Sequence, residues 1–260
     1  MKKDYFWLHL RDLPYFRALL RSVESTFYQE IQFARPILDV GCGDGHFAHV
    51  TFDDLIDIGV DLDLKIMRKA QRRERYRTLV QSDGAILPFD DNSLASAISN
   101  SVLEHIPHLN AVLNEVGRVL RPGAHFVFTV PNPGYRSELS VPRALNRLGL
   151  SSLSKTYVDW FMVMSRTVTI EYEQTWADRL SAAGFEILRT FRYFSPAALR
   201  TLEWGHYFGA PCLIPHAISG NWIISPTHWN LWLTDRLIRK YHDAAPIENG
   251  TYSYYRVIKR

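Results

Sequence analysis

Three glycines at alternate positions follow a short apolar run, and this pattern constrains the fold more than any other in the chain. The run occupies residues 37–40, long enough for a buried parallel strand, and Gly41, Gly43 and Gly45 follow it. A strand that leads through such a turn into a helix exposes bare backbone at the carboxyl edge of a sheet. A Cβ there would keep a ligand away from the main chain. The sequence therefore predicts an α/β fold with a ligand site at this turn.

The glycine spacing argues against two common classes of nucleotide-binding turn. The dinucleotide fingerprint has glycines at its first, third and sixth places, whereas here the third glycine comes one residue early and His46 holds the sixth place. A phosphate-binding P-loop needs a Gly-Lys-Ser/Thr sequence, which this turn lacks.

Acids recur in register with three successive predicted strands. Asp39 lies in the first strand, Asp61 ends the second (residues 55–61), and Asp83 follows the third (residues 78–81). A carboxylate in the place of Asp61 can accept hydrogen bonds from ribose hydroxyls, although it can also cap the helix that begins near residue 63. The alternative for Asp83 is an ordinary turn rich in Asp, Gly and Asn.

Three stretches carry a resemblance to a known family. Ile37 to Ala48, ILDVGCGDGHFA, resembles motif I of the class I S-adenosylmethionine (SAM) methyltransferases. The tetrad from Leu103 to Ile106 and the run NEVGRVLRPGAHFVFTVPN look like the large small-molecule branch. The family's DNA adenine and protein glutamine enzymes carry Asn/Asp-Pro-Pro-Tyr/Phe at the fourth strand end. This chain has Asn-Ser-Val-Leu from Asn100, which argues against those substrates.

The resemblance implies a doubly wound, mainly parallel sheet of seven strands, the last antiparallel. It also implies SAM as cofactor and S-adenosylhomocysteine as product. Asp39 would reach the ligand directly or through water, Asp61 would bind the ribose, and Asp83 would accept from the adenine amino group. The cofactor-binding residues implied in this way are Asp39, Gly41, Cys42, Gly43, Gly45, Asp61, Leu62, Asp83, Gly84, Ala85 and Asn100.

Methyl transfer from a sulfonium is an in-line displacement, so the protein mainly supplies proximity and alignment. A base is needed only when the acceptor must lose a proton. The candidates are His105, His206 and Tyr207, and His105 has the alternative role of a histidine that packs locally. Metal-ligand pairs at helical spacing are absent from the sequence, so we expect no metal.

We expect one methyltransferase domain over residues 1–260, with residues 1–36 as an N-terminal helical cap. Residues 131–170 begin with proline-rich and Ser/Leu-rich turns, and residues 196–249 form a second insertion. Both are rich in aromatic residues and leave the sheet where the methyl group must be presented. They predict a lid over a small, apolar or lipid-like acceptor, methylated on oxygen. The alternative is that these aromatics form only the core of the lid.

The remaining predictions concern partners and location. A net charge of +3 is too small to indicate nucleic acid. Two cysteines and the lack of a visible signal peptide favour a reduced, cytoplasmic protein. Peripheral membrane contact through Trp222 to Trp232, helped by the basic stretch from Lys65 to Arg77, stays open, as does the oligomeric state. Two other classes also stay open: a SAM- or S-adenosylhomocysteine-binding protein without catalysis, and a nicotinamide oxidoreductase.

Overall fold

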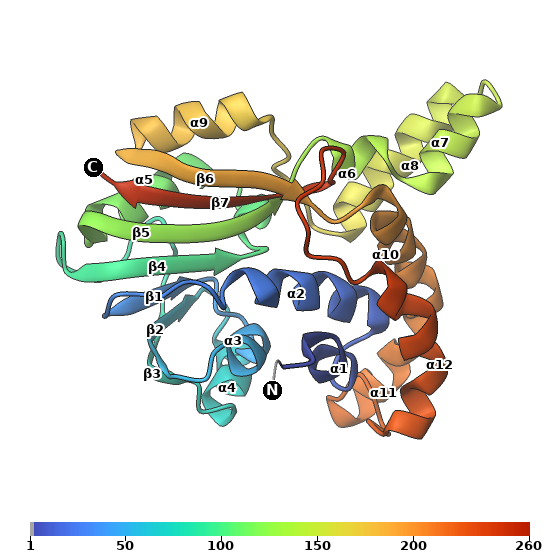
Figure 1. Cartoon of the computed structure of the whole chain (residues 1–260), viewed down its shortest axis with the longest axis horizontal. Coiled ribbons are helices and arrows are strands. Elements are labelled where there is room, and N and C mark those ends of the chain that lie inside the picture. Colours follow the sequence, from blue (N-terminus) through green and yellow to red (C-terminus); the bar gives the residue numbers. More distant parts are fainter. Residues whose placement is uncertain (1–2) are drawn as a thin grey trace. The chain divides into compact units, whose positions relative to one another are not determined.

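The computed structural model describes residues 3–260, which form two compact units that we treat separately (Figure 1). The sheet unit comprises Glu30–Pro133, Trp160–Phe191 and Tyr252–Arg260. The helical unit comprises residues 3–29, Gly134–Asp159 and Arg192–Thr251. Residues 3–29 of the predicted cap and most of both predicted insertions thus fall in the helical unit, and the role of the insertions as a lid stays a prediction.

The sheet unit contains one seven-stranded sheet in the order β3-β2-β1-β4-β5-β7-β6. Strands β1 to β5 pair in parallel and β7 pairs antiparallel with β5, which confirms the predicted fold. The strands are β1 (Ile37–Val40), β2 (Ile56–Asp61), β3 (Tyr76–Gln81), β4 (Leu94–Asn100), β5 (Leu120–Pro131), β6 (Phe185–Tyr193) and β7 (Tyr252–Lys259).

Strand β1 lies where the strand order reverses, because its two neighbours are β2 and β4. Leu38 pairs with Ile58 on one side and with Ala97 on the other, and all four residues of β1 are buried. Ligands of doubly wound folds bind outside the carboxyl ends of the strands at such a reversal. The topology therefore puts the glycine turn after β1 at the expected binding edge.

Amphipathic helices cover the sheet. They are α3 (His46–Thr51), α4 (Leu64–Arg72), the short 3-10 helix η1 (Leu103–His105), α5 (Leu109–Val119) and α9 (Glu173–Ala182). Helix α5 buries Val112, Leu113 and Val116 in the main core, which also contains Phe128 and Trp176. In α4 the buried residues are Met67 and Ala70, so its cations lie on the outer side.

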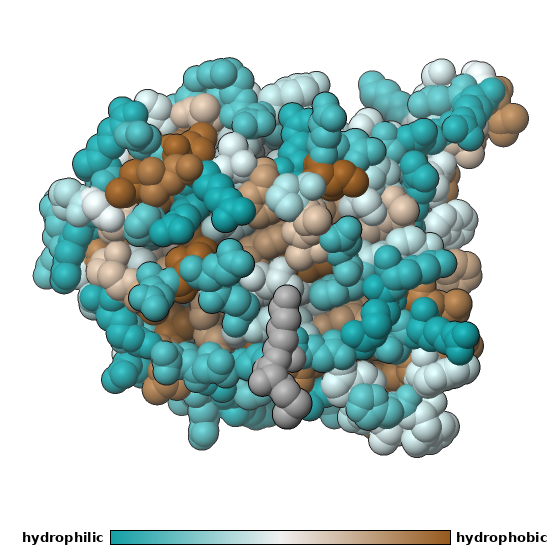
Figure 2. Space-filling model, in the orientation of Figure 1, coloured by the Kyte–Doolittle hydropathy of each residue, from teal (hydrophilic) through white to brown (hydrophobic). Residues whose placement is uncertain are grey.

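The helical unit is organised around α2, which packs against α1, α10 and α12. The α-helices of this unit are α1 (Tyr5–Leu10), α2 (Tyr15–Phe27), α6 (Gly134–Ser137), α7 (Ser140–Arg147), α8 (Ser151–Met164, which ends in the sheet unit), α10 (Pro196–Phe208), α11 (Leu213–Ser219) and α12 (His228–Ile238). The turns predicted after Pro131 are therefore wrong, because α6, α7 and α8 occupy much of that stretch. Hydrophobic side chains gather at the outer end of the α7–α8 hairpin (Figure 2).

A buried carboxylate explains why α7 forms without a local cap. Leu139 precedes α7 and provides no side-chain hydrogen bond. Instead Glu203 of α10, which is fully buried, accepts the backbone N–H groups of Ser140 at 2.5 Å and Val141 at 3.2 Å. It also accepts the Ser140 hydroxyl at 2.6 Å and the Tyr157 hydroxyl at 2.9 Å. An anion at a helix N-terminus satisfies the unpaired N–H groups of the first turn.

Within residues 3–260 there is no helix both long and apolar enough to cross a membrane.

Candidate cofactor site

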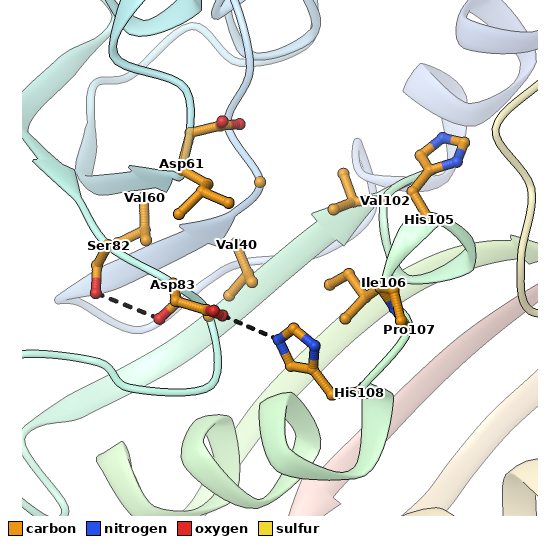
Figure 3. A pocket seen from close by; sticks show the side chains of 13 residues that line it. Val40, Val60, Asp61, Ser82, Asp83, Val102, His105, Ile106, Pro107 and His108 are labelled. Atoms are coloured by element: carbon orange, nitrogen blue, oxygen red, sulfur yellow. Dashed lines mark hydrogen bonds and ion pairs between the residues drawn. The ribbon is translucent and has the colours of Figure 1, made fainter.

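A cavity of about 210 Å³ opens at the carboxyl ends of β1, β2 and β3, inside the sheet unit (Figure 3). Asp61 and Asp83 lie on one side of it, and Val102 and His105 lie on the other. The lining residues are Val40, Gly41, Val60, Asp61, Leu62, Ser82, Asp83, Gly84, Val102, His105, Ile106, Pro107 and His108. The topology thus brings together residues from four separate strand ends.

The glycine turn meets this cavity through Gly41. Gly41 and Gly43 have φ angles of 79° and 55°, in the left-handed region that favours glycine. A Cβ on Gly41 would lie 2.4 Å from Cγ1 of Val102, so only glycine fits there. A Cβ on Gly43 would meet no heavy atom within 4 Å. That open space beside bare backbone is what the methionine part of SAM would need, so the turn fits the cofactor that the resemblance implies.

Asp61 is held in place by two backbone N–H groups. Its Oδ2 accepts from Gly43 at 2.8 Å and its Oδ1 accepts from Asp63 at 2.9 Å. The helix-cap alternative applies to a different residue, because Asp63 itself caps α4 through Lys65 and Ile66. Asp61 is therefore a preorganised carboxylate at the cavity wall, as ribose binding requires. Leu62, which follows it, is 67% exposed and offers an apolar surface at the same wall.

Asp83 has a partner that the sequence did not reveal. Its Oδ1 accepts the backbone N–H of Ala85 at 2.9 Å, and His108 Nε2 lies 3.3 Å from the same oxygen (Figure 3). The Ala85 hydrogen bond and the His108 contact lower the pKa of Asp83, so it is ionised at neutral pH. Ala85 does not line the cavity and packs against the core instead. An ionised Asp83 can accept from an adenine amino group.

Three predicted cofactor residues lie deeper than the cavity wall. Asp39 is buried and accepts the Tyr76 hydroxyl at 2.6 Å, and desolvation together with this carboxylate raises the pKa of Tyr76. Asn100 is buried and accepts from Thr129 at 3.2 Å. Burial, reinforced by Asp39, raises the pKa of the Cys42 thiol, so it stays protonated and is not a nucleophile. Gly43 and Gly45 also fall outside the lining set. Cofactor contacts of these residues stay predictions.

His105 lines the cavity on η1. Its Nδ1 lies 2.8 Å from the carbonyl oxygen of Arg166, and a carbonyl can only accept, so Nδ1 carries the proton. The Nε2 lone pair of the neutral ring is then the basic one, 3.9 Å from the Glu104 carboxylate. A histidine that acts as a base and a histidine that packs locally can both make this contact, so the catalytic role of His105 stays a prediction.

The other two candidate catalytic residues belong to the helical unit. His206 donates from Nδ1 to the carbonyl of Leu202 at 3.0 Å and packs on the Phe16 ring, and burial lowers its pKa. The Tyr207 hydroxyl lies 2.5 Å from that of Tyr157, which donates to Glu203. Both residues make structural contacts within their unit, and catalysis by them stays a prediction.

The comparisons with known proteins agree with this site. Residues 38–128 match the family described as "Methyltransferase domain". A fatty-acid O-methyltransferase of Mycolicibacterium smegmatis is 31% identical over 64% of this chain, which spans 62% of that protein's length. The crystal structure of geranyl diphosphate C-methyltransferase from Streptomyces coelicolor, which holds S-adenosyl-L-homocysteine, is 15% identical with a TM-score of 0.57 and covers 95% of this chain and 84% of its own.

A crystal structure of the 4+2 cyclase SpnF has a TM-score of 0.55 at 19% identity and covers 94% of this chain and 81% of its own. At these identities the two structures establish the fold alone. The family match does more, because it spans the glycine turn, both strand-end acids and the tetrad around His105. The fold and the cavity lined by Gly41, Asp61 and Asp83 agree with this match, so residues 38–128 are similar to the methyltransferase domain family in sequence and in the arrangement of the site.

Proposed function

We propose that this protein transfers the methyl group of SAM to a carboxylate or other oxygen of a small, apolar or lipid-like acceptor such as a fatty acid. The observation that supports SAM as the methyl donor is the cavity lined by Gly41, Asp61 and Asp83. The acceptor half is supported by the similarity to a fatty-acid O-methyltransferase. The chain spans about three fifths of that relative, so its activity and acceptor are part of the proposal.

The bound cofactor would supply a methyl group already activated on a sulfonium. The work left to the chain is to hold both reactants in line. The Asp61 carboxylate, fixed by Gly43 and Asp63, would accept the two ribose hydroxyls. Asp83 would accept from the adenine amino group, and His108 would orient that carboxylate through its Nε2 contact.

The chemistry of the acceptor decides whether His105 acts as a base. A fatty-acid carboxylate is already ionised at neutral pH and needs no proton removed. Nε2 of His105 would then position an acceptor oxygen rather than deprotonate it. A hydroxyl acceptor would instead require the basic Nε2 that the Arg166 contact selects. We favour the carboxylate because one curated relative is a fatty-acid O-methyltransferase.

We assign acceptor selection to the helical unit. The carboxyl end of β5 lies at the cofactor edge of the sheet, because β5 runs parallel to β4, and the chain passes from β5 into the helical unit after Pro133. The helical unit carries many exposed apolar side chains, which favours an apolar acceptor over a charged polymer. A nucleic-acid substrate is not part of this proposal.

The test uses methyl-labelled SAM with a chain-length series of fatty acids and, in parallel, their primary alcohols. We expect label in the methyl esters of the acids and none in the alcohols. The Asp61→Ala variant is the matched negative control, since it removes the ribose contacts. Label in neither series, with SAM bound at normal affinity, would refute the acceptor and would favour a SAM-binding protein without this activity.

A further inference from the structure

The helical unit contains a long stretch without side-chain charge that is nevertheless exposed. Residues 204–234 contain no Asp, Glu, Lys or Arg. They include α11 and most of α12, and several of their large apolar side chains face solvent, with Ile218 82% and Trp229 79% exposed. Soluble proteins rarely expose contiguous apolar surface of this kind without a partner. The exposed members of this α11–α12 surface are Leu213, Ile214, Ile218, Trp229, Trp232, Leu233 and Leu237.

Helix α12 has distinct inner and outer faces. Leu231 is buried, and α12 packs against α1 and α2 on that side. His228 stacks on Trp7 with ring centroids 3.6 Å apart, which fixes the start of the helix. Trp229 and Leu233, four residues apart, are exposed together on the outer face. The apolar outer face is therefore held rigidly outward and is not a frayed end.

Two cations lie beside this surface. Arg236 and Lys240 follow Trp229 and Leu233 at helical spacing, and the Arg236 guanidinium lies 5.5 Å from the Trp232 ring. Two nearby acids, Asp235 and Asp4, are both paired with Arg239, at 2.7 Å and 2.9 Å. Tryptophan and leucine side chains flanked by cations are the composition of helices that lie in the headgroup region of anionic bilayers.

We propose that the α11–α12 surface docks on an anionic lipid membrane, with Trp229 and Leu233 in the headgroup–acyl boundary and Arg236 and Lys240 against lipid phosphates. A second copy of the chain fits less well. A two-fold interface would bring the cations of both copies together, while the nearby acids Asp4 and Asp235 are already paired with Arg239. Unlike the predicted surface that combined Trp222 to Trp232 with the basic stretch from Lys65, this one needs cations of the helical unit alone.

The first experiment is co-sedimentation of the full chain, without SAM, with vesicles of phosphatidylcholine alone or mixed with phosphatidylglycerol. We expect binding to the mixed vesicles that weakens as salt rises. The double variant Trp229→Asp, Leu233→Asp should bind at least about tenfold more weakly, because each change removes a buried apolar side chain from the lipid contact. Val163→Asp is the matched control, since Val163 is a 78% exposed apolar residue of α8 outside the surface.

The second experiment locates the contact. Brominated lipids should quench tryptophan fluorescence in the native chain, and the variant Trp229→Phe, Trp232→Phe should keep vesicle binding but lose most of the quenching. Equal quenching in that variant, equal binding by the Asp double variant with an unchanged melting temperature, or no vesicle binding at low salt would each overturn the proposal. A dimer in sedimentation equilibrium that the Asp variant converts to monomer would also overturn it. Because no assay here measures methyl transfer, these results do not depend on the proposed acceptor.

Discussion

Replacing Asp61 by alanine tests the cofactor site at the carboxylate whose position is best defined. Each oxygen of this carboxylate already accepts one backbone N–H, from Gly43 and from Asp63. The carboxylate therefore cannot turn away from the cavity, and its remaining lone pairs are aimed before the ligand arrives. Little conformational entropy is lost when a ribose hydroxyl binds to a carboxylate that is already held in place. The hydrogen bond should therefore contribute to the binding free energy of SAM near the upper end of the usual range for charged hydrogen bonds.

The expected loss of SAM affinity is about 1.5–3 kcal/mol, or roughly 12- to 160-fold in Kd, for the ribose contacts together. Asp63→Ala is the matched control, because it also removes one carboxylate only two residues along the chain. The Asp63 side chain caps α4 and does not line the cavity. That variant should lose about 1 kcal/mol of stability and keep its SAM affinity.

Isothermal titration calorimetry with SAM, together with melting temperatures, separates the two effects. Asp61→Ala should show weak binding at a nearly native melting temperature, whereas Asp63→Ala should show the reverse. An Asp61→Ala protein that binds SAM within about twofold of the native Kd would refute the ribose assignment, since a twofold change corresponds to only about 0.4 kcal/mol.

Three further predictions concern the glycine turn, the histidine at the cavity and the histidines of the helical unit. Gly43→Val should abolish SAM binding measured by calorimetry, while Gly123→Val, which has the same kind of φ and equal open space away from the cavity, should cost only about 1–2 kcal/mol of stability. His105→Gln should lower kcat with a fatty acid by less than about tenfold and leave the Kd for SAM within about twofold, because no proton need be removed; a loss of kcat above about a hundredfold would contradict this reasoning. Burial lowers the pKa of both His206 and His242, so the unfolded chain binds protons that the folded chain does not. The stability that comes from these two neutral histidines should therefore be at its full value above about pH 6.5 and be lost as the pH falls below it. Urea titrations in which the free energy of unfolding does not decline from about pH 7.5 to 5.5 would contradict this.

Much of the sheet unit could be predicted from sequence because its signals are local. The apolar run before Gly41 predicts β1. Asp61, the acid that ends β2, is recognised by its regular distance from the glycine turn. The contacts that shape the cavity wall are not local. His108 reaches Asp83 from 25 residues away at the start of α5, and Val102 closes over Gly41 from another strand end. Side-chain reach between such segments leaves no periodic signal.

The helices after Pro131 were also not predicted, because a contact from a distant part of the chain stabilises them. Residues 140–147 lack a capping side chain at their start, so the local sequence reads as a turn. The missing cap is the carboxylate of Glu203, which approaches Ser140 from 63 residues later. A helix stabilised by a partner so far along the chain is visible only once the tertiary structure is known.

The order of strands in the sheet has a consequence for how the chain folds during synthesis. β7 lies between β5 and β6, so β6 has no place in the sheet until β7 is present. The Arg256 guanidinium meets His125 across a separation of 131 residues, and β7 belongs to the final stretch of these residues to leave the ribosome. Until then β5 presents an unpaired edge and β6 has no neighbour from β5 or β7. Such an edge recruits other strands, so the nascent chain should depend on a holding chaperone up to the moment β7 inserts.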